Sequence, residues 1–152
     1  MKVAGIVAEY NPFHTGHGYQ IEQTRAALGG ETGIIAVMSG NWVQQADCAI
    51  ADKWLRARLA LMGGADLVLE LPTVWASASA EHFAFGAVSI LKNAGGEVLS
   101  FGSEDGNADL LKQVAAVLDS EEFRTALRKH LDEGLPFAVC RQRAVEDIMG
   151  AD

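Results

Sequence analysis

The chain has 152 residues, of which 49% are hydrophobic and 21% charged, and its formal net charge is −8 at pH 7. The length suits one domain with a sizeable core, and the acidic balance excludes a broad electrostatic attraction to nucleic acid or to anionic membranes. We expect a cytoplasmic protein without membrane contact, because no apolar run reaches the ~20 residues that span a bilayer.

Apolar runs of strand length alternate with helical patterns along the chain. The runs predict four buried strands, at residues 2–8, 33–38, 66–71 and 97–101. The helical patterns, with Asp or Gly at several of their ends, predict helices at residues 16–28, 52–62, 77–93 (or 79–93), 108–118, 121–131 and 137–149. Nearly continuous apolar strands between helices form parallel sheets covered on both faces. We therefore expect an α/β fold with a Rossmann-like, doubly wound parallel sheet.

The predicted sheet has four strands, whereas open sheets of this kind usually have more. We therefore expect residues 1–152 to be one domain and the N-terminal portion of a longer protein. The sequence does not predict an oligomeric state.

His14 and His17 stand between the first predicted strand and the first predicted helix. In open α/β sheets, ligands bind beyond the carboxyl ends of the strands. Asn11-Pro12 indicates a turn there, and Gly16 opens a helix whose free N–H groups and dipole favour phosphate. Two histidines at i and i+3 can face the same side. They could instead cap the helix or form one edge of a metal site, but a zinc site has no obvious third ligand, and we predict no metal ligands.

Imidazole N–H groups that reach phosphate oxygens would make hydrogen bonds of ~1.5–3 kcal/mol each. If two such bonds tighten as phosphoryl charge redistributes, they accelerate attack on the α-phosphate of ATP by ~10²–10⁴. We therefore interpret His14 and His17 as catalytic residues that act without a protein nucleophile.

Two further loops follow predicted strands. Ser39, Gly40 and Asn41 form either a pocket wall for the nucleotide or a small acid, or an ordinary turn. Gly102 follows the fourth strand directly, where the lack of a side chain lets a ligand approach the main chain. Ser103 or Asp105 is expected to cap the next helix.

Charged side chains elsewhere have simpler interpretations. Lys53 and Arg56 could meet phosphate or RNA, but we expect solvated helix charges. Glu70 is expected to have a structural role. A local basic patch has one candidate set of residues: Arg124, Arg128, Lys129, Arg141 and Arg143.

The string His14-Thr15-Gly16-His17 resembles the HxGH signature of the nucleotidyltransferase superfamily that includes class I aminoacyl-tRNA synthetases. Longer segments are similar to the bacterial tRNA(Met) cytidine acetate ligase family: GIVAEYNPFHTGH, VMSGNWVQ, ADKWLRARLALMGGADLVLELP, SAEHFAFGAVSIL and FGSEDG. This resemblance covers residues 2–105. It implies an ATP-dependent ligase that forms acetyl-adenylate from ATP and acetate and then acetylates the wobble cytidine of elongator tRNA(Met).

The resemblance also implies site residues and partners. ATP would be held by Val7, Ala8, Glu9, Tyr10, Asn11, Pro12, Phe13, His14, Thr15, Gly16, His17, Gly18, Tyr19, Gln20 and Gly102. Mg²⁺ bridging the phosphates is expected by analogy with adenylate chemistry. The tRNA would be bound mainly through the family's C-terminal region, which this chain lacks.

Thr15 stands where the family commonly has an asparagine, and the chain departs from the family in two further places. Gln45-Ala46-Asp47-Cys48 stands where the family tends to have a segment that begins with arginine, and the superfamily's second phosphate motif, with serine and arginine, is absent. Two alternatives therefore stay open: a small-molecule adenylyltransferase of the same superfamily, and a nucleotide-binding module without catalysis.

Overall fold

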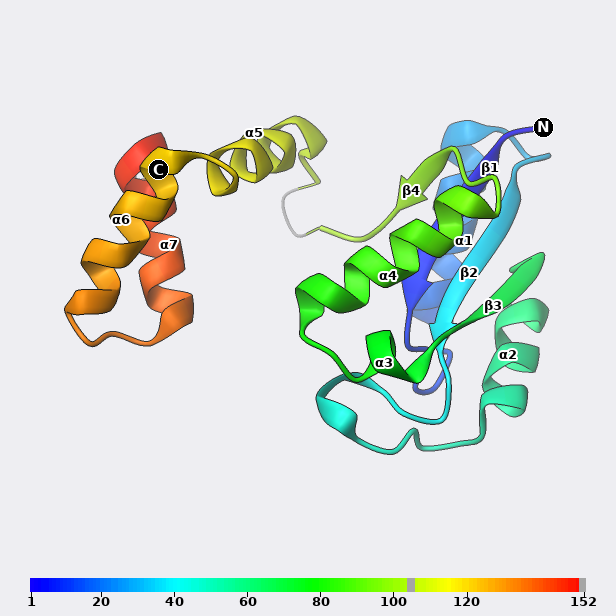
Figure 1. The fold of residues 1–152 in the computed structure, drawn as a ribbon. Coiled ribbons are helices and arrows are strands. Elements are labelled where there is room, and N and C mark those ends of the chain that lie inside the picture. Colours follow the sequence, from blue (N-terminus) through cyan, green and yellow to red (C-terminus); the bar gives the residue numbers. More distant parts are fainter. Residues whose placement is uncertain (104–105, 151–152) are drawn as a thin grey trace. The chain divides into compact units, whose positions relative to one another are not determined.

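The computed structural model describes residues 1–103 and 106–150. The chain divides into two compact units, Met1–Gly102 and Ser103–Asp152, which we describe separately (Figure 1). No helix within the described ranges is long and apolar enough to cross a membrane.

The first unit contains a four-stranded parallel sheet in the order β3-β2-β1-β4. Its strands are β1 (Val3–Ala8), β2 (Gly33–Ser39), β3 (Leu67–Leu71) and β4 (Val98–Ser100). Strands β2 and β3 follow β1 on one side of it, whereas β4 pairs with β1 on its other side. The strand order therefore reverses between β1 and β4. Ligand crevices form at the carboxyl ends of the strands at such a reversal. The predicted doubly wound α/β sheet is confirmed.

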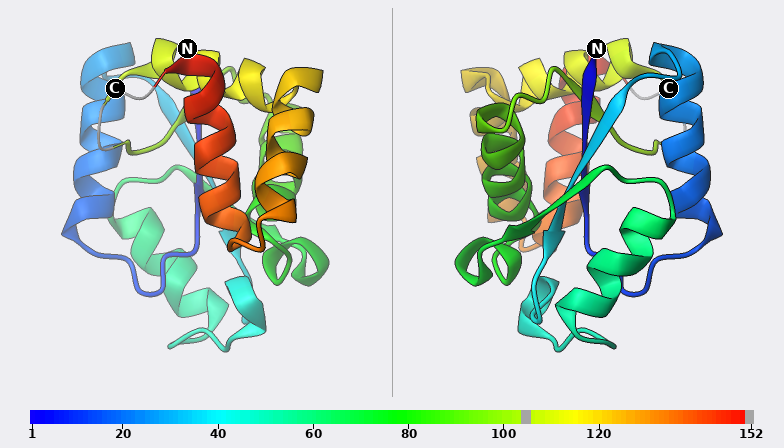
Figure 2. Two further views of the ribbon diagram at one scale, coloured as in Figure 1. Left: turned by 90° about the vertical axis from the view of Figure 1, so that its left-hand side faces the viewer. Right: turned by 90° about the vertical axis from the view of Figure 1, so that its right-hand side faces the viewer.

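Helices cover both faces of this sheet (Figures 1 and 2). On one face lie α1 (Thr15–Leu28) and α2 (Lys53–Met62), and on the other lie α3 (Thr73–Ala76) and α4 (Ala80–Asn93). A 3-10 turn, η1 (Gln44–Ala46), lies between β2 and α2. The longer helices lie where the sequence predicts them. The patterns do not predict η1 and α3, because three or four residues are too few to display a helical period.

Strand β2 shows why the strands of this sheet have continuous apolar sequences. Ile34 and Met38 belong to the core under α1 and α2, whereas Ile35 and Val37 belong to the core under α3 and α4. Each face of the strand is thus buried by its own pair of helices, and alternation with polar residues is lost.

In its described residues the second unit contains α5 (Ala108–Leu118), α6 (Glu121–Asp132) and α7 (Phe137–Met149). Buried side chains of α6 and α7 are Phe123, His130, Cys140 and Ala144. The Nε2 atom of His130 lies 2.8 Å from the carboxylate of Asp147.

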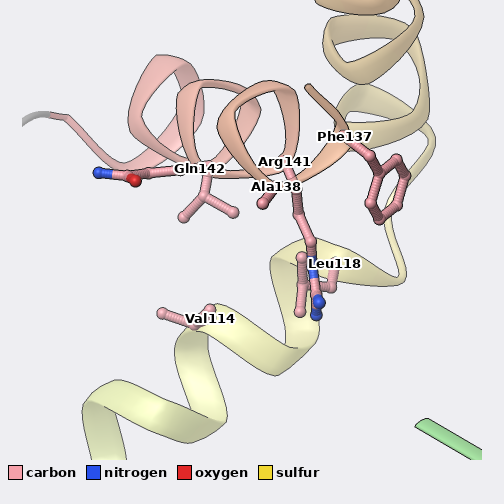
Figure 3. Close-up of a pocket in the computed structure, with 7 residues that line it drawn as sticks. Val114, Leu118, Phe137, Ala138, Arg141 and Gln142 are labelled. Atoms are coloured by element: carbon pink, nitrogen blue, oxygen red, sulfur yellow. The ribbon is translucent and has the colours of Figure 1, made fainter. Parts of the chain in front are cut away.

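The cap of α5 differs from the sequence prediction. The side chain of Asn107 accepts hydrogen bonds from the amides of Asp109 and Leu110, each at 3.1 Å. Asn107 is therefore the cap in place of Ser103, and Asp105 lies outside the described residues. An apolar groove runs between α5 and α7 (Figure 3), lined by Val114, Leu118, Phe137, Ala138, Arg141, Gln142 and Val145.

Candidate functional site

The β1–α1 loop, residues 9–14, turns the chain over the carboxyl end of β1. Tyr10 adopts a φ of 46°, a left-handed conformation that is unfavourable for a residue with a bulky side chain. Its ring is only 1% exposed and packs edge to face on Phe13, with centroids 4.9 Å apart. Burial raises the pKa of the Tyr10 hydroxyl to about 12. The side chain of Tyr10 therefore anchors this turn in the core.

His14 and His17 form a reciprocal capping box at the start of α1. The Nδ1 atom of His14 accepts a hydrogen bond from the amide of Gly16, and Nδ1 of His17 accepts one from the amide of His14, each at 3.2 Å. The two rings stack with centroids 3.7 Å apart and planes inclined by 24°. His14 is exposed and His17 is half-buried.

This cap corrects one expectation about phosphate binding. We expected a helix that starts at Gly16 and has free N–H groups at its terminus, but α1 starts at Thr15 and the amide of Gly16 is bonded to His14. The physical reason is that the imidazole competes for the first unpaired N–H group of the helix. The hydrogen-bond donors at the start of α1 therefore include the imidazole rings of His14 and His17 as well as main-chain amides.

The hydrogen bonds of the cap assign the protons on the two rings. Because each Nδ1 accepts a main-chain proton, a neutral ring carries its own proton on Nε2. Burial, and secondly the neighbouring His14, lower the pKa of His17 below its usual 6.5. His17 is thus neutral near pH 7. The capping box therefore offers Nε2–H donors that are suited to hydrogen bonding with phosphate oxygens.

Helix α1 is also bonded to β4, across the reversal in strand order. The side-chain amide of Gln20 donates to the main-chain oxygen of Ser100 at 3.1 Å, and the hydroxyl groups of Thr24 and Ser100 lie 2.7 Å apart. Gly102 follows two residues later and is exposed, and a Cβ atom built on it would meet no heavy atom within 4 Å. Gly102 therefore leaves the main chain open to approach just after β4.

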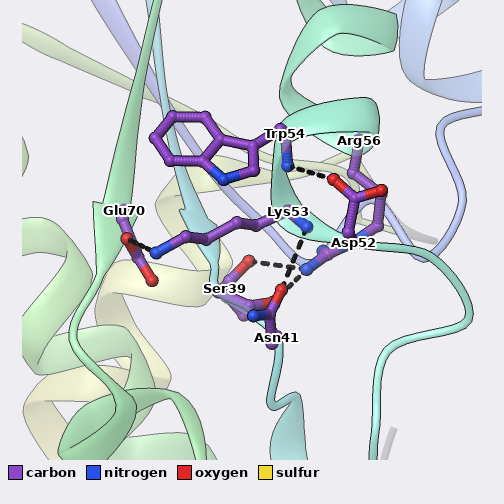
Figure 4. A network of polar contacts seen from close by, with 8 residues as sticks. Ser39, Asn41, Asp52, Lys53, Trp54, Arg56 and Glu70 are labelled. Carbon is purple, nitrogen blue, oxygen red and sulfur yellow. Dashed lines mark hydrogen bonds and ion pairs between the residues drawn. The ribbon is translucent and has the colours of Figure 1, made fainter.

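The three predicted substrate residues at the end of β2 differ in accessibility. Ser39 and Gly40 are buried, and only Asn41 is exposed. The Asn41 side chain accepts a hydrogen bond from the amide of Lys53 at 3.0 Å (Figure 4). A Cβ atom on Gly40 would collide with the carboxylate of Glu70. This loop is therefore closely packed, with Asn41 at its surface.

Arg56 of α2 is completely buried (0% exposed) beneath these loops. Its Nε atom donates to the oxygen of Ala51 at 3.1 Å, and Nη1 donates to that of Glu9 at 2.6 Å. Its Nη2 atom donates to the oxygens of Ser39, at 3.1 Å, and Gly40 (Figure 4). Burial lowers the pKa of Arg56, and the carboxylate of Glu9 partly offsets this.

The expectation that Lys53 and Arg56 are solvated helix charges is therefore wrong for Arg56. Lys53 is half-buried and forms an ion pair with Glu70, with 2.6 Å between Nζ and Oε2. Helical periodicity cannot identify the burial of Arg56, because the carbonyl groups that surround it belong to loops distant in sequence.

Further hydrogen bonds join the β1–α1 loop to the β2–α2 connection, residues 40–52. The carboxylate of Glu9 accepts from the amide of Gln44 at 2.8 Å, and the side chain of Asn11 accepts from the amide of Ile50 at 2.7 Å. Two residues that were predicted to hold ATP thus also bind a second loop. Sequence analysis does not identify this link.

The remaining predicted ATP residues lie at the end of β1 and along the start of α1. Pro12, Thr15 and Tyr19 are exposed, and half-buried positions are Val7, Ala8 and Gly18. With the residues described above, they complete the predicted stretch of residues 7–20, which runs from the end of β1 into α1.

Two further predictions concern metal ligands and a basic patch in the second unit. Within residues 1–103 and 106–150, no three His, Cys, Asp or Glu side chains are grouped to hold a metal ion. In the predicted basic patch, Arg124 pairs with Glu121, and Arg143 lies 3.6 Å from Glu133. Acidic side chains therefore interrupt the charge of that patch.

Comparison with known proteins gives consistent matches over the whole chain. The HIGH Nucleotidyl Transferase family matches residues 1–151. The tRNA(Met) cytidine acetate ligase of Caldicellulosiruptor saccharolyticus is 44% identical over 154 residues, which cover 100% of this chain and 38% of that protein. The enzyme of the same name from Halothermothrix orenii is 45% identical over 148 residues, covering 95% of this chain and 35% of that protein. The chain thus spans less than two fifths of the curated relatives it matches.

A solved structure agrees with these similarities. Thermotoga maritima TmcAL bound with alpha-thio ATP has a TM-score of 0.88 and 43% sequence identity to this chain, and the match covers 97% of this chain and 36% of that one. Its apo form has a TM-score of 0.87. The family resemblance that the sequence motifs indicate is confirmed.

Proposed function

Because this chain belongs to the HIGH Nucleotidyl Transferase family, we propose that it binds ATP at the start of α1 and activates acetate for a tRNA(Met) cytidine acetate ligase. The observation that carries the proposal is the capping box of His14 and His17 at the carboxyl end of β1. It presents imidazole donors beside the reversal in strand order, where ligands bind in open sheets. The curated ligases and the TmcAL complex with alpha-thio ATP support the choice of nucleotide and acid.

The first step forms acetyl-adenylate. A carboxylate oxygen of acetate attacks the α-phosphorus of ATP, the bond from that phosphorus to the bridging oxygen breaks, and pyrophosphate leaves. His14 and His17 donate hydrogen bonds from Nε2 to phosphate oxygens as the charge redistributes. His17 acts as a neutral donor, since its lowered pKa keeps it uncharged near pH 7.

The second step transfers the acetyl group. The exocyclic amine of the wobble cytidine attacks the acetyl carbon, AMP leaves with the bridging oxygen, and the amine loses a proton. The partner is tRNA(Met) in the cytoplasm, read at unstacked anticodon bases. The net charge of −8 supports a tRNA surface supplied mainly by the part of the ligases that lies beyond this match.

Magnesium is expected with the nucleotide, but the described residues do not form a protein cage for it. The carboxylates of Glu9 and Glu70 are already bonded to the amide of Gln44 and to Lys53. A Mg²⁺ ion bound through phosphate oxygens and water needs few protein ligands.

ATP–pyrophosphate exchange with and without acetate tests the proposal, preceded by calorimetric titration of the chain with ATP. We expect ATP binding and exchange that requires acetate. A chain that does not bind ATP would overturn the proposal. Transfer of AMP to a phosphate ester would identify an adenylyltransferase, and binding without exchange would identify a non-catalytic module.

A further inference from the structure

We infer that Arg56 is a positioning residue for the nucleotide site. Its buried guanidinium holds the β1–α1 loop against the β2–α2 connection, and this contact gives the His14–His17 capping box one fixed position. The inference rests on the proposed function, because it concerns the site that is assigned there to ATP.

The hydrogen bonds of Arg56 connect three separate parts of the chain. A guanidinium has five N–H groups in a rigid plane. In Arg56 these groups reach the oxygens of Glu9 after β1, of Ser39 and Gly40 at the end of β2, and of Ala51 before α2. All of these acceptors are main-chain carbonyl groups, so the bonds fix the course of the backbone itself.

Because position 56 is buried, neither an apolar side chain nor lysine can replace the hydrogen bonds that the arginine makes. A buried cation is unfavourable unless polar groups replace the water that it loses, and at Arg56 the carbonyl dipoles do so. An apolar side chain of similar size would avoid that desolvation but would leave the oxygens of Glu9, Ser39 and Gly40 without this donor. A lysine keeps the charge but has no planar fork that can reach all of these oxygens.

A shift at Glu9 would reach the histidines through direct contacts. The ring of Tyr10, the next residue, lies with its centroid 4.8 Å from that of His17, and the ring of Phe13 lies 5.4 Å from it. The bonds from Glu9 to Gln44 and from Asn11 to Ile50 link the same loop to the β2–α2 connection. Loss of the Arg56 hydrogen bonds therefore loosens both loops together.

The experiment compares Arg56→Met and Arg56→Lys with Arg58→Met, a control that removes an exposed positive charge from the same helix. ATP affinity is measured by calorimetry at a temperature where circular dichroism shows each variant fully folded. Hydrogen exchange is measured at the amides of Gln44 and Ile50. A role in fold stability alone would leave the ATP affinity and the loop exchange of the folded protein unchanged.

We expect Arg56→Met to raise the Kd for ATP by about tenfold or more, and Arg58→Met to change it by less than about twofold. Exchange at the amides of Gln44 and Ile50 should accelerate in Arg56→Met and stay unchanged in Arg58→Met. Arg56→Lys should raise the Kd by at least about threefold, since it keeps the charge and loses the fork.

A folded Arg56→Met variant with the ATP affinity and loop exchange of the wild type would overturn the inference and leave the proposed function standing. If Arg56→Met does not fold, Arg56→Lys decides in the same way. If the wild-type chain does not bind ATP, the proposed function fails and this inference fails with it.

Discussion

The Nδ1 atom of His17 accepts a hydrogen bond from the main-chain amide of His14, 3.2 Å away, and so closes the first turn of α1. In a common capping box a glutamate or glutamine makes this bond. Here the imidazole of His17 makes it, and the Nε2 atom of the same ring is left free to donate a hydrogen bond. The same side chain therefore has a structural role and a proposed chemical role, and these roles can be separated by choice of substitution.

His17→Gln should keep the helix cap and lose the imidazole donor that is proposed to bind phosphate. The glutamine oxygen can accept from the amide of His14, but the imidazole donor is gone. We expect acetate-dependent exchange to fall by about 10–100-fold with little change in Tm. His82→Gln is the matched control, because His82 is bonded to Ser79 on another helix. Equal rates in His17→Gln and the wild type would contradict the phosphate role.

His14→Ala and His14→Asn should differ in stability. Alanine leaves the Gly16 amide without its side-chain acceptor, whereas asparagine is among the best capping residues. We expect His14→Ala to lower the free energy of unfolding by about 1 kcal/mol, and His14→Asn to stay within about 0.5 kcal/mol of the wild type. Urea denaturation measures both values. Equal losses in the two variants would show that the cap contributes nothing.

The lowered pKa of His17 predicts a pH dependence of stability. Below its usual pKa of 6.5, the unfolded chain binds a proton at His17 that the folded chain does not bind. The free energy of unfolding should therefore decrease as the pH falls through that value, until the folded ring also titrates. Urea denaturation from about pH 8 to about pH 5 should show a smaller slope for His17→Gln than for the wild type. Identical slopes would contradict this assignment.

Gly63→Ala should disturb the site from beneath the β1–α1 loop. A Cβ atom on Gly63 would collide with the ring of Phe13, which packs against Tyr10 and His17. We expect a loss of about 1–3 kcal/mol in the free energy of unfolding. Gly30→Ala is the control, since a Cβ atom there meets nothing within 4 Å. It should change stability by less than about 0.5 kcal/mol. Similar values for the two variants would show that the Phe13 ring moves freely.

The sequence predicts the sheet well because strands that are buried on both faces, such as β2, are continuous apolar runs. It predicts the start of α1 less well. Serine, threonine, aspartate and asparagine are the usual caps, so His14 carries no common capping signal. For the two histidines the sequence left open whether they donate to a ligand or cap the helix, and the structure shows that their Nδ1 atoms cap it. Their contact with ATP stays a prediction.

The contacts of Arg56 could not be predicted from local pattern. In α2 the residue stands among Lys53 and Arg58, and a charge in that position normally faces water. Its partners, Glu9 and Ser39, are 47 and 17 residues away in sequence, and only the tertiary structure brings their carbonyl groups together. Asn11 and Ile50 meet for the same reason.

The hydrogen bonds around Arg56 use only residues between Glu9 and Arg56. During synthesis on the ribosome, every part of this arrangement therefore emerges before β4 is made. The bond from Gln20 to Ser100 is added later, when the fourth strand arrives beside β1. The order of translation thus allows the β1–α1 loop with His14 and His17 to form before β4 is in place beside β1.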